Sequence, residues 1–403
     1  MSAASRRGRE VPLIDPTSRR PLRADRPWSL TDGEARWPVV EGIPFLRPGR
    51  DDLRRSALDR LDAGNPRAAL GLLLADQDDF ARIAPPDPPA LARLIDAVED
   101  GSATLRDAMA ALHFGPVADY FAYRWSSPTY LSGLALLDRH ARGGSTVLEV
   151  ACGIGHYLRD LAARGRPCLG LDVVFAKLWL ARRFVVPPEV PLICGDASRG
   201  LPVGPIEASA VAFCHDAFYF LPAKGRVIEA LLGAVGEGGT ILIGHAHNSA
   251  FDHGGVAGEP RTPDEYAAFL PGCDLFDDAE LARSAWSRTP APARPPGELA
   301  AVEAVAMAWP GGEGARDRAP CLTRPIPGAR LRLNPLLVDE DGTLRPAWPS
   351  PRFEAEYAAA SPYLFGEPTP SAEVLAKASR GELDPEVARL ATRRILLDLP
   401  ERW

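Results

Sequence analysis

Residues 147–162 read VLEVACGIGHYLRDLA, and this stretch decides the fold. An apolar run that contains a single carboxylate, Glu149, leads into two closely spaced glycines, Gly153 and Gly155, and then into the periodicity of an amphipathic helix. Glycine has no Cβ atom, so the backbone at these positions can turn sharply and pass close to a ligand. The stretch therefore predicts a buried strand, a tight loop beside a ligand, and a helix.

The same alternation continues on both sides of this loop. Over residues 143–248, apolar strand-like runs alternate with amphipathic helical runs, which is typical of a parallel sheet covered on both faces. The sequence thus predicts a doubly wound, Rossmann-like α/β core. We expect residues 300–310 and 330–346 to supply late strands of that sheet, with a turn at Asp341-Gly342.

The chain is long enough for more than one unit, and its pattern changes several times. We expect four segments: a small β module over residues 1–50, a helical connector or lid over residues 51–112, the α/β domain over residues 113–338, and a C-terminal extension over residues 339–403.

Three acidic residues follow one another at the expected ends of successive strands. These are Glu149, Asp172 in LGLDVV and Asp196 in ICGDA. Ligands of doubly wound sheets bind at the carboxyl ends of the strands, where a carboxylate can accept hydrogen bonds from ribose hydroxyls. A single acid there is often a helix cap or turn former. Three in succession favour a binding site.

The stretch VLEVACGIGHY resembles the first motif of class I S-adenosylmethionine-dependent methyltransferases, and the resemblance extends over about residues 115–250. It implies S-adenosylmethionine as the cofactor, held by Glu149, Gly153, Gly155, Asp172 and Asp196. Similar helices in this family lie over the methionine end of the cofactor. The resemblance therefore adds candidate cofactor contacts in the aromatic-rich segment 113–140 and next to the strand ends: Tyr120, Arg124, Tyr130, Ala197, His215 and Asp216.

Candidate catalytic residues lie at the ends of the fourth and fifth strands. The sequence FCHDAFYFLP supplies His215 and Tyr219, and GHAHN supplies His247. Imidazole titrates near neutral pH, so either histidine can serve as a general base for an O or N nucleophile, while orientation of the acceptor accounts for much of the rate. Each histidine can also be structural.

A metal site is the alternative interpretation of the same histidines. His245 and His247, two residues apart on one strand, would share a face, and Asp252 or His253 would complete a ligand set. We expect no metal site.

Residues 1–50 resemble a zinc-ribbon-like domain that is fused to, or partnered with, some methyltransferases. The ending WPVVEGIPFL is similar to that family, but Asp15 and Ser18 stand where its first cysteine pair would be, and no cysteine precedes Trp37. A tetrahedral zinc site needs about four nitrogen or sulfur ligands. The module is thus expected to lack the metal.

The composition restricts the class of protein. A formal charge of −7 provides no general attraction to nucleic acid or to an anionic membrane, and no secretory or membrane-spanning segment is visible. The six scattered cysteines are expected to be reduced thiols in a cytoplasmic protein.

Three functions are compatible with these observations. The first is methyl transfer to a small-molecule acceptor, with neither a nucleic acid nor a membrane as partner. A catalytically silent S-adenosylmethionine-binding partner protein is the second, and an NAD(P)-linked oxidoreductase is the third. The oxidoreductase is disfavoured because Leu158 replaces the third glycine of its fingerprint and because Glu149 would lie beside a pyrophosphate.

Overall fold

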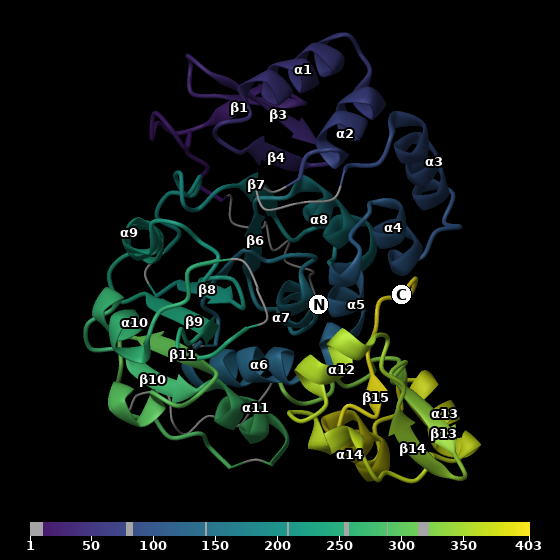
Figure 1. Cartoon of the computed structure of the whole chain (residues 1–403). Helices are drawn as coiled ribbons and strands as arrows, with labels where there is room; N and C mark the ends of the chain where they lie inside the picture. The colour runs from purple at the N-terminus through teal and green to yellow at the C-terminus, as the bar shows by residue number, and fades with distance from the viewer. Residues whose placement is uncertain are drawn as a thin grey trace, which may run out of the picture.

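An eleven-stranded sheet runs through the centre of the computed structural model, in the order β1-β2-β3-β4-β7-β6-β5-β8-β9-β11-β10 (Figure 1). The structure describes residues 11–77, 84–141, 143–207, 209–253, 258–287, 289–312 and 322–403. The strands of the sheet are β1 (Arg23–Arg26), β2 (Ser29–Thr31), β3 (Arg36–Val40), β4 (Ile43–Leu46), β5 (Val147–Val150), β6 (Cys168–Asp172), β7 (Leu192–Gly195), β8 (Val211–His215), β9 (Thr240–His247), β10 (Asp274–Asp277) and β11 (Ala304–Trp309).

The strands from β7 to β9 form the parallel core of the sheet. Strand β5 lies between β6 and β8, so the strand order reverses at β5. Neighbouring residues of β5 belong to separate hydrophobic clusters, Val147 to one and Leu148 to the other, because the sheet is covered on both faces. The predicted doubly wound Rossmann-like fold is confirmed.

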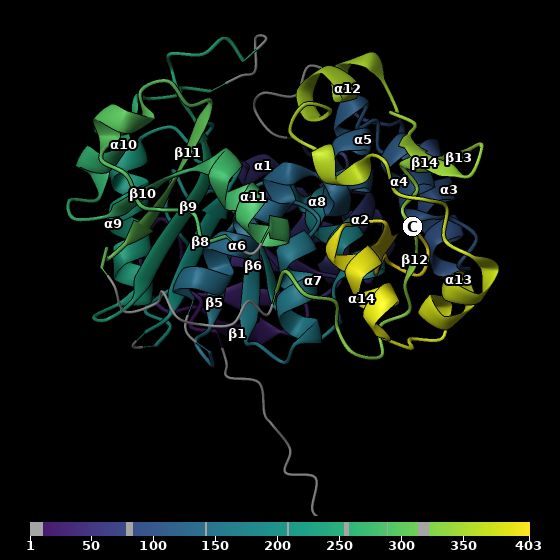
Figure 2. The ribbon, with the colours of Figure 1, turned by 90° about the horizontal axis from the view of Figure 1, so that it is seen from below.

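Six helices cover this core, and they are packed on both faces (Figure 2). They are α6 (Pro128–His140), α7 (His156–Ala163), α8 (Phe175–Leu180), α9 (Lys224–Val235), α10 (Pro263–Phe269) and α11 (Asp278–Ser287). Helix α7 begins directly after the glycine loop, as the quoted stretch predicts. The carboxyl ends of the parallel strands therefore converge on the N-terminus of α7.

The N-terminal strands continue the main sheet. Strand β4 pairs in parallel with β7, with Phe45 opposite Cys194 and Leu46 opposite Gly195. Without this pairing, β7 would be an open edge. The buried Asp15 organises the preceding turn, because its Oδ1 accepts hydrogen bonds from the amides of Thr17 and Ser18 at 2.7 and 2.8 Å.

The other oxygen of Asp15, Oδ2, accepts a hydrogen bond from the Trp37 indole at 2.8 Å. Since Asp15 holds this turn where a zinc ribbon would use a cysteine pair, we expect metal analysis of the purified full chain to find no stoichiometric zinc. A full equivalent of zinc that persists in the variant His247→Ala would contradict this prediction. The variant separates a site in the N-terminal strands from one near the histidines.

Helices α1 (Asp51–Asp62), α2 (Pro66–Leu74), α3 (Pro88–Glu99), α4 (Leu105–Ala111) and α5 (Pro116–Tyr123) connect the N-terminal strands to the core. The side chains of Asn65 and Asp87 cap α2 and α3, and a capping box of Thr104 and Asp107 begins α4. The helices expected over residues 51–112 are thus present, whereas the division of the chain into four segments stays a prediction.

The expectation for residues 330–346 was wrong. Strand β11 does join the main sheet, but β13 (Leu337–Glu340) and β14 (Thr343–Pro346) form a separate hairpin, and β12 (Arg332–Leu333) pairs only with β15 (Leu396–Leu397). Three consecutive residues of β13 are exposed, so this strand has no second apolar face for an interior position. The predicted turn at Asp341-Gly342 does join β13 to β14.

The C-terminal region packs against the core beside α5 and α7 (Figure 2). Its helices are α12 (Pro351–Tyr357), α13 (Ala372–Ser379) and α14 (Pro385–Thr392). The Tyr363 hydroxyl donates to the Ser126 carbonyl, and the Trp403 indole donates to the Ala122 carbonyl, both at 2.7 Å. Among the described residues, no helix combines the length and the apolar character needed to cross a membrane.

Candidate functional site

The loop after β5 adopts a conformation that requires glycine. Gly153 and Gly155 have φ angles of 56° and 82°, and Ala151 has 58°. A Cβ atom at Gly155 would lie 2.7 Å from Val186 Cγ1, and one at Gly153 would lie 3.0 Å from Phe121 Cε1. The two glycines thus satisfy both a left-handed backbone and close packing.

Asp172 ties this loop to the next strand. Its Oδ2 accepts a hydrogen bond from the Gly153 amide and its Oδ1 accepts one from the Val174 amide, each at 2.9 Å. Asp172 is only 2 % exposed. Its carboxylate therefore lies at the carboxyl end of β6 in contact with the glycine loop, where the sequence places a ligand.

Glu149 is buried at the same edge with an unsatisfied oxygen. Its Oε2 has no hydrogen-bond partner among the described residues. Burial raises the pKa of Glu149 to about 8, and the nearby charge of Arg124 opposes this shift. A buried polar oxygen without a partner is costly, so a ligand that hydrogen-bonds to Oε2 fits this position.

The third acid, Asp196, directly follows β7. Its Oδ1 accepts a hydrogen bond from the Ser198 amide at 2.9 Å, and its Oδ2 lies 3.5 Å from Arg199 Nε. Ala197 beside it is buried. Glu149, Asp172 and Asp196 therefore lie on three adjacent strands, at the edge where their carboxyl ends meet.

Asp216, directly after β8, is the centre of a buried polar cluster. Its Oδ2 accepts hydrogen bonds from the Tyr120 hydroxyl at 2.5 Å and from Arg124 Nη1 at 3.1 Å. Its Oδ1 accepts one from the Tyr219 hydroxyl at 3.0 Å. Burial opposes ionisation, but the charges of His245 and Arg124 outweigh it and hold the pKa of Asp216 well below its usual range.

His245 is held by an acid on α11. Its Nδ1–H donates to Asp278 Oδ2 at 2.8 Å, and its amide donates to Asp278 Oδ1 at 3.1 Å. Burial lowers the pKa of His245, but Asp278 and Asp216 together raise it to about 9. The imidazole of His245 is thus a cation at neutral pH.

The His245–Asp278 pair makes stability depend on pH. The folded-state pKa lies above the ordinary value of 6.5, so the stabilisation is complete below pH 6.5 and is lost as the pH rises through about 9. From the shift, we expect the free energy of unfolding to fall by up to about 3 kcal/mol over this range. Urea unfolding at both ends of the range measures this fall.

The variant Asp278→Asn should remove most of this fall, because the partner that raises the pKa of His245 is lost. Asp277→Asn, at the adjacent and partly exposed position, is the matched control. An equal fall in all three proteins would contradict the assignment.

His247 is the neutral counterpart of His245. Its ring stacks on Tyr219 at 3.8 Å and on His253 at 4.0 Å between centroids. Burial and the charge of His245 lower the pKa of His247 to about 3. The ring centroids of His245 and His247 are 5.2 Å apart. A φ of 48° at His245 interrupts the regular alternation of side chains along β9, which the prediction of a shared face requires.

The other two predicted catalytic residues, His215 and Tyr219, are both buried. His215 donates from Nε2 to the Thr129 carbonyl at 2.8 Å, and its buried Nδ1 has no partner among the described residues and faces Gly244. Burial lowers the pKa of His215 to about 4. Burial raises the pKa of Tyr219 well above its usual range. The catalytic roles of His215 and Tyr219 stay predictions.

Tyr130 does not join the cluster. It is fully buried, donates its hydroxyl hydrogen to Asp160 on α7, and lies against Arg394 of the C-terminal region. The other two residues predicted from the same segment, Tyr120 and Arg124, do contact Asp216. Tyr130 thus lies apart from the predicted cofactor contacts at the strand ends.

Sequence reasoning missed two residues of the cluster. Asp278 begins α11, where an acid normally indicates only a helix start. Tyr357 is in α12, and burial first and then the charge of Asp216 raise the pKa of Tyr357 well above its usual range. Neither residue belongs to a sequence motif that would indicate its place in the cluster. Ligand atoms of Asp216, His245 and His247 lie within 4.8 Å of one another, a different set from the alternative with Asp252 or His253.

Comparison with known proteins identifies the central segment. Residues 148–243 match the family model described as a methyltransferase domain. The comparison with curated proteins found no match. The segment from β5 into β9 thus matches a methyltransferase domain and has the class I fold, and this match together with the acid-lined strand edge supports S-adenosylmethionine as the cofactor.

Several solved structures are similar over part of the chain. A complex of the Haloferax volcanii Trm112 methyltransferase activator with a methyltransferase is 17% identical, covers 51% of this chain and 96% of that chain, and has a TM-score of 0.35. The Haemonchus contortus phosphoethanolamine N-methyltransferase 2 is 15% identical, covers 51% and 59%, and has a TM-score of 0.34. A Thiobacillus denitrificans methyltransferase in complex with S-adenosylhomocysteine is 25% identical, covers 31% and 52%, and has a TM-score of 0.26. At these TM-scores the similarities add no detail to the site.

Proposed function

We propose that the methyltransferase domain at residues 148–243 transfers a methyl group from S-adenosylmethionine to an O or N nucleophile of a small-molecule acceptor. One observation carries the proposal: three acids, the glycine loop and the Asp216 cluster meet at the carboxyl edge of the parallel strands, where β5 reverses the strand order. When bound, S-adenosylmethionine supplies a methyl group activated by a positively charged sulfonium.

The residues at this edge suit the parts of that cofactor. Asp172 would accept hydrogen bonds from the ribose hydroxyls next to the glycine loop. Asp196 and Ala197 would contact the adenine. The Glu149 Oε2 atom, which has no partner among the described residues, would accept a hydrogen bond from the cationic methionine end of the cofactor. Arg124 would attract the carboxylate of the same end. A pyrophosphate has no comparable place beside Glu149, which disfavours a dinucleotide.

The histidine pair suits the acceptor end. His247 is neutral, so its imidazole can accept a hydrogen bond from an acceptor O–H or N–H and orient the lone pair for in-line displacement. The proton of the acceptor would pass to His247 and then to solvent, while the cation His245 holds Asp216 ionised. With a pKa of about 3, His247 is a weak base that acts mainly through orientation.

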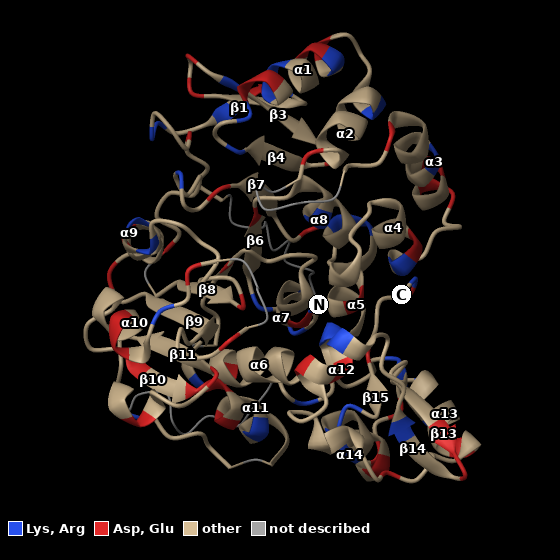
Figure 3. Cartoon of the chain, in the orientation of Figure 1, with Lys and Arg blue, Asp and Glu red and all other residues tan. Residues whose placement is uncertain are grey.

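The charge distribution supports a small acceptor rather than nucleic acid. Acidic and basic residues are interspersed on helices such as α1 and α12 (Figure 3). Among the N-terminal arginines, Arg20 pairs with Glu34 and Arg26 with Asp62. The chain thus combines a net charge of −7 with locally neutralised arginines.

The test compares S-adenosylhomocysteine formation across a panel of small alcohols, phenols and amines. His247→Ala should lower turnover at least about tenfold with unchanged cofactor affinity, whereas His113→Asn, at an exposed position, should match the wild type. A fully active His247→Ala variant would remove His247 from the reaction. Cofactor binding without turnover of any acceptor would favour the catalytically silent binding protein.

A further inference from the structure

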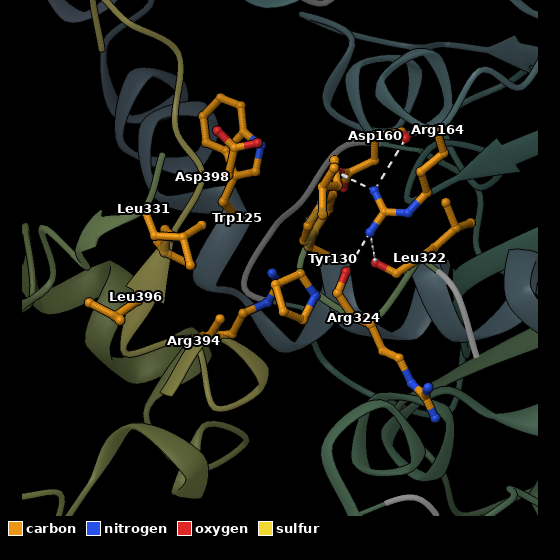
Figure 4. A pocket seen from close by; sticks show the side chains of 14 residues that line it. Trp125, Tyr130, Asp160, Arg164, Leu322, Arg324, Leu331, Arg394, Leu396 and Asp398 are labelled. Atoms are coloured by element: carbon orange, nitrogen blue, oxygen red, sulfur yellow. Dashed lines mark hydrogen bonds and ion pairs between the residues drawn. The ribbon is translucent and has the colours of Figure 1, made fainter. Parts of the chain in front are cut away.

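A small cavity lies between the core and the C-terminal region, and it shares no residue with the Asp216 cluster. Its volume is about 30 Å³. Trp125, Tyr130, Asp160 and Arg164 line it from the core, and Arg394 with Asp398 lines it from the C-terminal region. In Figure 4, Arg394 and Arg164 lie on either side of Tyr130.

Arg394 presents an intact hydrogen-bonding fork to this cavity. Its Nε and Nη2 atoms are both buried and have no hydrogen-bond partner among the described residues. These two nitrogens form one edge of the guanidinium, the edge that binds both oxygens of a carboxylate or phosphate in a bidentate manner. Two buried donors of a cation without an acceptor call for a ligand.

A third unpartnered donor lines the same cavity. The Trp125 side chain is 3% exposed, and its Nε1 is also buried with no partner among the residues that the structure describes. An indole nitrogen can only donate. Trp125 and Arg394 come from segments far apart in the sequence, yet both leave donors unsatisfied at one cavity.

The acids at the cavity already have other cations. Asp160 accepts from the Tyr130 hydroxyl and pairs with Arg164 at 3.6 Å, and Asp398 pairs with Arg159 at 2.8 Å. These pairs leave the charge of Arg394 uncompensated. The cavity therefore has a positive balance that favours an anion.

The backbone and an aromatic ring fix the position of Arg394. It has a left-handed φ of 58° after α14, and its carbonyl accepts a hydrogen bond from Asn334 Nδ2 at 2.8 Å. Its guanidinium carbon lies 5.3 Å from the centroid of the Tyr130 ring, within the range of a cation–π contact. Such a side chain is preorganised for a ligand.

We propose that this cavity binds the oxyanion group of a small molecule, a carboxylate or a phosphate, with Arg394 as the bidentate contact and Trp125 as the third donor. The cavity admits only the anionic group. Arg324 and Pro325 line both the cavity and a wider neighbouring groove of about 770 Å³, which offers space for the rest of the ligand. The site is independent of the proposed methyl transfer.

The test is calorimetric titration of the full chain with inorganic phosphate and with formate, at constant ionic strength in chloride. The wild type should show saturable binding of at least one. Arg394→Lys keeps the charge but removes the fork, and it should weaken binding at least about tenfold. Arg380→Lys, at an exposed position that lines neither cavity nor groove, should bind like the wild type.

Trp125→Phe provides a second variant that keeps an aromatic side chain but removes the indole N–H donor, and it should weaken binding several-fold. Tighter binding of phosphate would identify phosphate esters as the ligand class, and tighter binding of formate would identify carboxylates. The absence of saturable binding in the wild type would overturn the proposal. So would an unchanged affinity in both Arg394→Lys and Trp125→Phe.

Discussion

Replacing Asp172 with alanine is expected to weaken S-adenosylmethionine binding about 100-fold or more. The carboxylate has two roles in the proposed site. It would accept hydrogen bonds from the ribose hydroxyls, and it already accepts hydrogen bonds from the Gly153 and Val174 amides, which hold the glycine loop. Loss of an acceptor from buried donors costs about 1–3 kcal/mol for each donor, and about 1.4 kcal/mol corresponds to a tenfold change in affinity. Calorimetry measures the loss directly.

Asp264→Ala, in the first turn of α10 and fully on the surface, is the control for this variant. It removes the same charge from an exposed position outside the three acids and the Asp216 cluster, and it should leave the affinity unchanged. If Asp172→Ala binds the cofactor as tightly as the control does, the assignment of the ribose site fails.

Replacing Arg124 with alanine is expected to lower the free energy of unfolding by about 1.5–3 kcal/mol, because the buried Asp216 loses the cation that donates a hydrogen bond to it and keeps only His245 as a nearby positive charge. Arg124 is 4 % exposed and also lies over the Tyr120 ring at 4.6 Å. Urea unfolding of the wild type and the variant measures the difference. The same variant should bind S-adenosylmethionine more weakly, since Arg124 would attract its carboxylate.

A double-mutant cycle separates the charge pair from packing. Asp216→Asn removes the carboxylate charge with which Arg124 pairs, so Arg124→Ala should cost much less in that background. An equal cost in both backgrounds would show that Arg124 stabilises the fold through packing alone. The cycle thus tests the centre of the Asp216 cluster.

The site residues that lie at or directly after the end of a strand were predictable from the sequence. Gly153, Gly155, Asp172 and Asp196 lie at the ends of parallel strands, and parallel strands place such residues at one edge. Local sequence contains this information, because each residue directly follows its own apolar run. The same reasoning placed α7 directly after the glycine loop.

The contacts between distant segments were not predictable. Asp278 meets His245 because β11 runs antiparallel between β9 and β10, which places the end of β10 level with the end of β9, and Asp278 directly follows β10. Tyr357 reaches Asp216 from the C-terminal region. The hydrogen bond of His215 Nε2 to the Thr129 carbonyl and the stacking of His247 between Tyr219 and His253 likewise join distant segments, and a sequence pattern does not contain that information.

The pairing of β4 with β7 illustrates the same limit. The strands of residues 36–46 were visible as apolar runs, but their partner lies about 150 residues later, across the helical connector. A short strand has no local signal for its neighbour, since pairing depends on the edges left open by the rest of the sheet.

Calorimetric titration of the full chain with S-adenosylmethionine, S-adenosylhomocysteine and NAD distinguishes a methyl-donor site from a dinucleotide site. We expect saturable binding of the first two and no binding of NAD, with the affinity for S-adenosylmethionine lost in Asp172→Ala. If neither S-adenosyl compound binds, the glycine loop and the three acids do not form a methyl-donor site, whether or not NAD binds.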